Sequence, residues 1–486
     1  MSKDLEQYLV DGYVPTIGIE CHVQLKTKTK LFSGVSNDAR MARPNTLISH
    51  IDVGMPGALP VLNKKAVELA CRAAYALNSV PAKFSKFDRK HYFYPDLPKG
   101  YQITQFDRPI ILGGSVSITT EGNSTKNIRI ARAHLEEDAG KLTHPAGKDF
   151  SLVDLNRAGT PLLEIVSEAD IHNAEEARVY AQELHLLMRY AEVSDADLYH
   201  GNMRFDVNVS VNNNGELGTR TETKNLNSFK SVEKAVEFEI ARQINLLKSG
   251  QKIIQETRGW DDAKQKTFSQ RSKEEAHDYR YFAEPDVPPV VLTDDFLEVI
   301  KQSMPEMPNQ VRAKLQKLSL DASAIETLVQ EIPAGKFILE IIEHIPDSAT
   351  RKIANWLVVD VQAMLIEQNL GWDTVKLNQD SFKALAKMVE DNMLNSTAAK
   401  KVLLLMVHNN QDPHTIAKEH DLLQVSDEDE ITQVVKDVLH RNKEATEDVR
   451  NGEMKAIGFL IGQVMQETKG KANPQLVQQI IKKLLQ

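Results

Sequence analysis

A strict alternation of apolar and polar residues marks residues 17–25. The odd positions carry Ile, Ile, Cys, Val and Leu, whereas the even positions carry Gly, Glu, His and Gln. A period of two predicts a β-strand with one buried face and one open face. Glu20 and His22 then lie side by side on the open face. Taken alone, this stretch fits a surface strand whose polar side meets water, so only matching patterns elsewhere favour a site.

Two further segments repeat the alternation. Residues 204–211 place Arg204 and Asp206 on a polar face, opposite Phe and Val positions. The Asn-rich turn that follows predicts a hairpin, and its return strand brings Glu222 and Lys224 onto one face. This alternation is typical of antiparallel sheets that cover one face and leave the other open.

Carboxylates also stand in unusual surroundings. Glu137 belongs to a run of three acids that ends a predicted strand, where like charges repel unless cations offset them. Glu164 lies inside the apolar, β-prone run 161–166, and a buried carboxylate there must be paired or coordinated. Both positions are therefore candidate ligands of a cation.

Helical periodicity organises the rest of the chain. Capped amphipathic helices are predicted over 63–77 and 228–248 and after Asn173. Beyond residue 294 glycine thins out and helical spacing takes over, with an acidic run near 426–430 close to a further boundary. The sequence predicts an α+β protein with three domains, at 1–294, 295–420 and 421–486.

Composition narrows the class of protein. The 486 residues are 41% hydrophobic and carry a net charge of -9, so nucleic-acid binding needs a local basic patch. No signal peptide and no run of about 20 apolar residues is present, which predicts a cytoplasmic protein without membrane spans. The two cysteines lie in apolar patterns and are predicted to be core residues.

An aromatic and basic loop surrounds Lys90. Residues 86–101 combine three cationic positions before His91 with five aromatic rings and two prolines. Such a loop can stack a base and hold phosphates, or it can pin two layers of the core together. The sequence leaves both interpretations open.

The polar positions together suggest metal-assisted nucleotide chemistry. Several carboxylates and one imidazole on neighbouring strands suit Mg²⁺ or Mn²⁺, and Mg²⁺ commonly shares its ligands with phosphate oxygens. The chain has no Gly-rich phosphate loop, Rossmann fingerprint or nucleophile elbow. A nucleotide site must therefore be built on the sheet face itself.

With these residues in hand, the chain closely resembles the B subunit of the bacterial aspartyl/glutamyl-tRNA amidotransferase over nearly its whole length. The resemblance implies an antiparallel-sheet cradle domain with a kinase site, then an all-α helical domain and a small helical tail domain that contact tRNA. The stretches that carry the resemblance are 17–25, 87–102, 134–141, 151–170, 203–210, 221–230, 255–260, 278–285 and 455–474.

The resemblance also implies a reaction and its partners. An amidase (A) subunit hydrolyses glutamine and delivers ammonia, and a small C subunit completes a heterotrimer. This subunit uses ATP and Mg²⁺ to phosphorylate the side-chain carboxylate of Glu or Asp misacylated onto tRNA-Gln or tRNA-Asn. Ammonia then displaces the phosphate and forms the amide. The sequence leaves open which of the two tRNAs is preferred.

Carried over residue by residue, the resemblance implies roles for nine positions. The metal ligands would be Glu20, His22, Glu137 and Glu164. Catalytic positions would be Lys90, Asp206, Glu222 and Lys224, and the phosphates would meet Lys90, Arg204 and Lys224.

One departure from the family concerns zinc. Many relatives carry two cysteine pairs near the start, whereas segments 32–36 and 48–53 of this chain contain no thiol. No structural zinc is expected, and the loop would be held by packing alone. Two rival functions remain: a tRNA-docking scaffold without kinase activity, and a stand-alone ligase of free amino acids.

Overall fold

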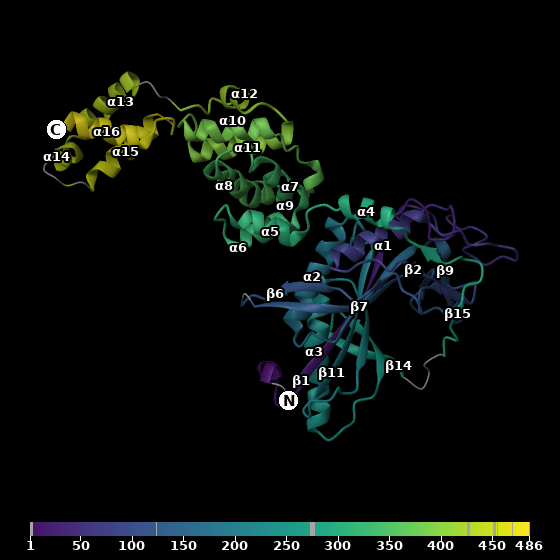
Figure 1. Ribbon diagram of the computed structural model, residues 1–486. Helices are drawn as coiled ribbons and strands as arrows, with labels where there is room; N and C mark the ends of the chain where they lie inside the picture. Colours follow the sequence, from purple (N-terminus) through teal and green to yellow (C-terminus); the bar gives the residue numbers. More distant parts are fainter. Residues whose placement is uncertain are drawn as a thin grey trace. The chain divides into compact units, whose positions relative to one another are not determined.

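The computed structural model describes residues 3–485 except 123, 273–277, 425–427, 451–452, 454 and 469. The chain forms two compact units, Met1–Met307 and Pro308–Gln486, and each is described by itself. The first unit holds a large sheet with its covering helices, and the second is helical (Figure 1). The first unit extends past the predicted boundary at 294, because helix α4 (Asp294–Gln302) packs on helix α1 (Lys64–Ala76).

One sheet of twelve strands dominates the described part of the first unit. Strands β5 (Ile111–Leu112) and β6 (Ser115–Thr119) pair with β7 beside the main path, and β16 (Val290–Val291) pairs with β2 (Phe84–Ser85). A further hairpin joins β8 (Lys141–Thr143) to β9 (Leu152–Asp154). The order of the main path is β14 (Lys266–Ser272), β13 (Glu256–Asp261), β12 (Thr221–Leu226), β11 (Met203–Asn212), β1 (Val14–Gln24), β10 (Pro161–Ser167), β7 (Thr125–Glu137), β4 (Tyr101–Thr104), β3 (Asp88–His91) and β15 (Phe282–Ala283).

Strand β1 lies near the middle of this sheet, and its burial alternates as the sequence predicts. It pairs antiparallel with β10 on one side and with β11 on the other. The sheet is nevertheless mixed, and the prediction of a purely antiparallel sheet is wrong, because β12 and β13 run parallel. The long helix α3 (Phe229–Lys248) joins these two strands and gives the chain the length that a parallel crossover requires.

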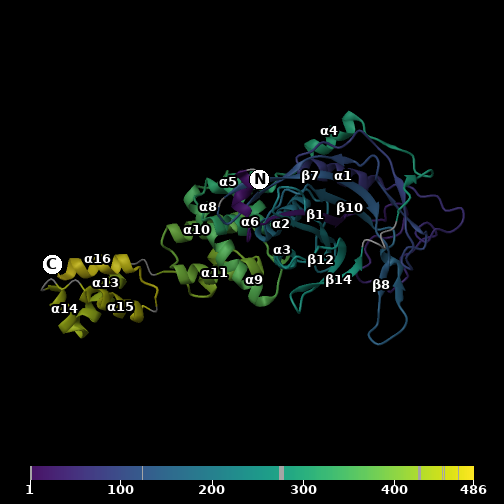
Figure 2. The same ribbon diagram turned by 90° about the horizontal axis from the view of Figure 1, so that it is seen from below.

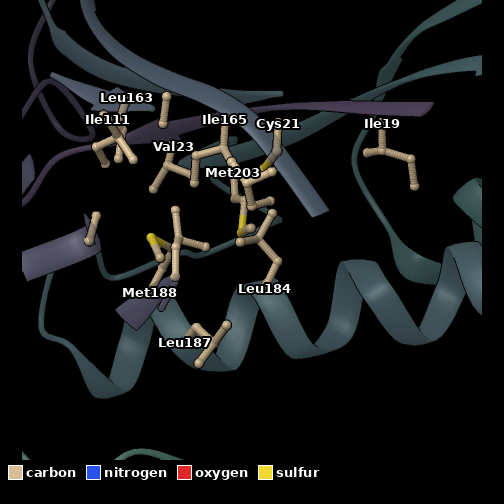
Figure 3. Packing of buried hydrophobic residues seen from close by; sticks show 14 of the residues in the cluster. Ile19, Cys21, Val23, Ile111, Leu163, Ile165, Leu184, Leu187, Met188 and Met203 are labelled. Carbon is tan, nitrogen blue, oxygen red and sulfur yellow. The ribbon is translucent and has the colours of Figure 1, made fainter. Parts of the chain in front are cut away.

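Three helices cover one face of the sheet and leave the other face open. Helix α2 (Ala174–Tyr190) begins at the predicted cap Asn173, whose side chain accepts a hydrogen bond from Glu176 N. Its Leu184, Leu187 and Met188 point toward the apolar side of the strands, where Cys21 and Ile165 lie (Figure 3). Helices α1 and α3 begin at Asn63 and Ser228, as predicted. Because this face is filled with apolar side chains, the polar residues of β1 are left on the open face.

The loop that follows β1 contains a buried ion pair. Lys30 Nζ lies 3.2 Å from Asp52 Oδ2, and both side chains are almost fully buried. Ser33 Oγ donates to Asp52 Oδ1 at 3.0 Å, and Ser49 N donates to Asp52 Oδ2 at 2.8 Å. The expectation that packing alone holds this loop is wrong, since a charged hydrogen-bond network joins the segments in which relatives place thiols.

The second unit is built from helices and one π-helical stretch, η4 (Trp356–Val361). Helices α13–α16 enclose an apolar cluster of their own, which includes Val435, Leu460 and Ile481 (Figure 2). A separate tail domain from residue 421 stays a prediction. The helices are α5 (Pro308–Gln316), α6 (Ala322–Gln330), α7 (Ile332–Ile341), α8 (Asp347–Asn355), α9 (Gln362–Gln368), α10 (Gln379–Glu390), α11 (Ser396–Asn409), α12 (Pro413–Glu419), α13 (Glu428–Arg441), α14 (Lys443–Arg450), α15 (Ala456–Glu467) and α16 (Pro474–Leu485).

Among the described residues, no helix has both the length and the apolar character that crossing a membrane requires. Both cysteines are buried and free, as the sequence predicts.

Candidate functional site

The register of three strands places acids from distant segments on the open face. His22 of β1 lies opposite Glu164 of β10 and Arg204 of β11. Glu20 lies opposite Asp206 of β11. Since side chains of one strand alternate between the two faces, these residues project to the same side as the polar positions of β1.

A first group of ligand atoms surrounds His22. Its Nε2 lies 3.6 Å from Glu136 Oε1 and 3.6 Å from Glu164 Oε2. We call His22, Glu136 and Glu164 the histidine cluster, and their ligand atoms lie within 4.8 Å of one another. His134 stands behind it, with Nε2 at 3.3 Å from Glu164 Oε2 and at 3.7 Å from Glu136 Oε2.

A second group, the carboxylate cluster, consists of Glu20, Asp206 and Glu222, again with ligand atoms within 4.8 Å of one another. Lys224 Nζ contacts two of these acids, at 2.7 Å from Glu222 Oε1 and 3.2 Å from Asp206 Oδ2. Asn208 Nδ2 donates to Glu20 Oε1 at 3.0 Å. One lysine thus faces three carboxylates, so a further cation would lower the repulsion among them.

Protonation follows from this arrangement of charges. Burial, together with the charges of Glu164 and Glu222, raises the pKa of Glu20. Burial alone would also raise the pKa of Glu164, but the imidazoles of His134 and His22 lower it below its usual range. Burial opposes the charge on His134, yet Glu164 and Glu136 raise its pKa to about 9. Glu20 is therefore the acid whose ionised form has the least support from the protein.

The structure corrects the choice between two adjacent acids of β7. The sequence analysis selected Glu137, but the carboxylate that reaches His22 belongs to Glu136. The carboxylate of Glu137 contacts Lys99 Nζ and accepts a hydrogen bond from Ile103 N at 2.9 Å. Successive residues of a strand point to opposite faces, so both acids cannot face His22.

Lys90 lies among aromatic rings at the edge of this face. Its Nζ stands 4.9 Å from the ring centre of Tyr279 and 5.9 Å from that of Tyr92. Burial alone would lower the pKa of Lys90, but the charges of Glu136 and Glu164 raise it. A cation held by rings in this way keeps its charge available to an anionic ligand.

The aromatic loop around Lys90 shows features of both interpretations. Phe87 is buried and packs edge-on against Phe32, with ring centres 5.4 Å apart, as a core-pinning loop requires. Phe93 and Tyr94 are exposed, so part of the loop faces solvent.

Arg204 already has a partner. Its Nη2 donates to Asp138 Oδ2 at 3.0 Å, and Arg157 Nε approaches the same oxygen at 3.3 Å. The charge of Asp138 raises the pKa of Arg204. Two arginines on one carboxylate leave positive charge to spare, which is compatible with a phosphate role for Arg204.

Sequence reasoning missed Glu136 and His134. Both lie on β7 with the same parity, separated by the buried Leu135. The same period of two that identified Glu20 and His22 could have found them. The Nδ1 atom of His134 is buried and has no hydrogen-bond partner among the described residues.

The arrangement suits chemistry on an anionic, phosphate-bearing substrate. Two sets of oxygen-rich ligands lie side by side, and Lys90 and Lys224 supply positive charge next to them. Oxygen ligands with one imidazole are typical of sites for Mg²⁺ or Mn²⁺. A preorganised set of this kind stabilises charge that develops during phosphoryl transfer.

Comparison with known proteins agrees with this geometry. Residues 15–298 match the family model described as the GatB/GatE catalytic domain. Residues 336–485 match the model described as the GatB domain. All site residues named above lie within the first match.

Full-length relatives share one name, which identifies each of them as the B subunit of an aspartyl/glutamyl-tRNA(Asn/Gln) amidotransferase. The protein from Caldanaerobacter subterraneus subsp. tengcongensis is 46% identical over 477 residues, which cover 97% of this chain and 99% of that protein. Those from Brevibacillus brevis and Coxiella burnetii are 44% and 45% identical, again over 97% of this chain and 99% of the relative.

Proposed function

The chain belongs to the GatB/GatE family, and we propose that it is the subunit that activates misacylated tRNA for amide formation. It would use ATP to phosphorylate the side-chain carboxylate of Glu on tRNA-Gln, of Asp on tRNA-Asn, or of both. The observation that supports this proposal is the pair of adjoining ligand clusters on one open sheet face. Its relatives are named as the B subunit of an enzyme that acts on these tRNAs.

The residues present fit Mg²⁺. His22, Glu136 and Glu164 would hold one ion, and Glu20, Asp206 and Glu222 would hold a second. The raised pKa of Glu20 supports this fit, because a nearby cation would favour its ionised form. When bound, the metal would offset the negative charge of the phosphate oxygens and orient them.

The chemistry explains why a kinase step precedes amide formation. A carboxylate is a poor electrophile, since its leaving group would be an oxide. In the first step a carboxylate oxygen bonds to the γ-phosphorus of ATP, and ADP leaves. In the second step ammonia bonds to the carbonyl carbon, loses a proton and expels inorganic phosphate. The protein would contribute orientation and positive charge, chiefly through Lys90 and Lys224.

Ammonia would come from a partner. We infer an amidase (A) subunit that hydrolyses glutamine and a small C subunit, which together with this chain form a heterotrimer. The relatives' shared name, which calls each of them a subunit, supports an assembly of several chains. The described residues of this chain offer no exposed thiol for a glutaminase reaction, since both cysteines are buried.

The helical unit would contact tRNA. The net charge of -9 argues against a general attraction to RNA, so the contact needs local cations. Lys482 and Lys483 lie in the last turn of α16, and Lys471 is paired with Asp421. Lys469, which the sequence also suggested, lies outside the described residues.

Two rival functions explain fewer observations. A scaffold without kinase activity would not need six convergent ligand side chains and a lysine between them. A stand-alone ligase of free amino acids would not need a helical unit of 179 residues, 308–486.

The test is ATP cleavage by the assembled complex, measured with and without misacylated tRNA. We expect cleavage that depends on misacylated tRNA and on Mg²⁺, with one phosphate released for each amide formed. Glutamine hydrolysis in the same samples serves as the control for assembly. Cleavage without amide formation, or amide formation without ATP, would refute the proposal.

A further inference from the structure

Two hollows flank the ligand clusters along the open face of β1. One, of about 360 Å³, adjoins the first half of the strand up to Glu20 and is called the β10 hollow here. The other, of about 380 Å³, adjoins the end of β1 from Gln24 onward and is called the end hollow. The residues of the β10 hollow on which the argument rests are Gly18, Ala131, Ser167, Ala169, Leu217 and Arg220.

The β10 hollow exists because β10 departs from β1 at a defined point. Regular pairing ends at Glu20 and Val166, and the pairing of β10 with β7 shifts register between Val166 and Ser167. Ile19 N then donates to the Ser167 side chain at 2.9 Å instead of to a backbone oxygen. The chain returns to β1 only at Ile171. Bulges of this kind commonly lie next to functional sites.

Small residues keep this space open. A Cβ atom on Gly18 would lie 3.9 Å from Ser167 O and 4.0 Å from the Cα of Ala169, so Gly18 faces the hollow. On another side, Gly218 approaches β11 so closely that a Cβ atom there would lie 2.2 Å from Val211 O. The segment 213–220 can therefore pack against β11 and bring Leu217 and Arg220 to the rim. The predicted hairpin turn is in fact this eight-residue connection.

The chemistry of the β10 hollow suits a flat aromatic ring attached to an anion. Its walls are mostly small or apolar, with hydroxyl and amide groups from Ser210 and Asn208 at the edge. Arg220 is exposed and has no ion-pair partner among the described residues. Ligand sites combine an apolar lining with a few polar groups, and their volumes begin near 300 Å³.

The end hollow has a different character. Ion pairs line it: Lys26 Nζ lies 2.6 Å from Asp195 Oδ1, and Arg40 Nη2 lies 2.8 Å from Asp38 Oδ2. A heterocyclic base placed there would have to displace these contacts or leave charged groups without solvent.

We propose that the β10 hollow binds an adenosine moiety, with the attached phosphates directed toward Glu20 and the carboxylate cluster. This inference rests on the proposed function, which supplies two sources of adenosine. One is ATP, and the other is the 3′-terminal adenosine that carries the aminoacyl group of the tRNA. The position beside Glu20, Asp206 and Glu222 favours ATP, because its triphosphate then reaches the oxygen ligands and Lys224.

The experiment fills the hollow without touching the ligand clusters. Ala169→Leu adds bulk at an exposed position of the rim, and Gly18→Val adds bulk on the floor at a position whose backbone tolerates a Cβ atom. Ala39→Leu in the end hollow is the matched control. Steady-state amidation by the assembled complex gives KM for ATP and, separately, KM for misacylated tRNA, while glutamine hydrolysis reports assembly.

We expect KM for ATP to rise at least about tenfold in both variants, because the added methyl groups occupy the space of the base. KM for tRNA and the control variant should stay near wild type. A rise in KM for tRNA alone would retain the adenosine site and assign it to the tRNA terminus. Unchanged KM values for both substrates would overturn the proposal, whereas a wild-type complex that cleaves no ATP would refute the proposed function instead.

A second measurement does not depend on activity. Wild-type complex is irradiated with 8-azidoadenosine triphosphate, and the labelled peptides are identified by mass spectrometry. We expect label within 166–170 or 213–220, and an excess of ATP should suppress it. Label confined to residues 37–40 of the end hollow would overturn the assignment even if a substituted chain failed to fold.

Discussion

The adjacent acids Glu136 and Glu137 offer a matched test of the site, because the same substitution at each should have opposite consequences. Glu136→Gln removes a charge from the histidine cluster, where the carboxylate lies 3.6 Å from His22 Nε2. Glu137→Gln removes a charge from a buried ion pair with Lys99, whose side chains are 3% and 6% exposed. Both changes keep the size of the side chain, so packing is held constant.

The expected magnitudes follow from these surroundings. Loss of one preorganised ligand or donor costs about 10²–10³ in rate, so Glu136→Gln should slow amidation by that factor. Its effect on stability should be small, because the acid is one of several like charges. Removing one partner of a buried pair costs about 3–5 kcal/mol, so Glu137→Gln should lower the free energy of unfolding by that amount.

Two assays separate the variants. Amidation by the assembled complex, with glutamine hydrolysis as the assembly control, measures the first effect. Thermal unfolding of the full chain measures the second, and 3–5 kcal/mol should lower Tm by roughly 6–10 °C at about 2 °C per kcal/mol. The reasoning is refuted if Glu137→Gln loses amidation at an unchanged Tm while Glu136→Gln remains near wild type. That result would return Glu137 to the ligand set.

Four further predictions concern other parts of the chain. Lys224→Met should slow amidation and tRNA-stimulated ATP cleavage by about 10²–10³, since Lys224 lies between two acids of the site, whereas retention of more than half the rate would make it a structural ion pair. Removal of residues 421–486 should weaken tRNA binding and reduce the salt slope by about one for each phosphate that the shortened chain no longer binds, and an unchanged slope in binding titrations would contradict a docking role. Asp52→Asn should lower the free energy of unfolding by about 3–5 kcal/mol in denaturant titrations, because it leaves Lys30 buried without its partner, and elemental analysis of the wild type should find no stoichiometric zinc. His185→Gln should reduce the loss of stability in acid: burial lowers the pKa of His185 from 6.5 to about 4, so protons favour the unfolded chain as pH falls from 6.5 to 4, by up to about 3 kcal/mol, and equal acid sensitivity of variant and wild type would contradict this.

The sequence by itself determined the local elements and one face of the site. Alternation in residues 17–25 predicted β1, and the caps Asn63, Asn173 and Ser228 predicted the starts of α1–α3. These features depend on neighbours a few residues apart, so the chain encodes them directly. The placement of Glu20 beside His22 on the open face is of this kind.

Only the tertiary structure decided which distant residues meet. The register of β10 and β7 against β1 brings Glu136, and not Glu137, to His22, although both acids lie in the same short run. The ion pair of Lys30 with Asp52 and the parallel pairing of β12 with β13 likewise depend on how separate segments dock. A shift of one residue in strand register moves every side chain to the opposite face, and composition and periodicity carry no information about that register. The choice between two neighbouring acids therefore had to wait for the folded sheet.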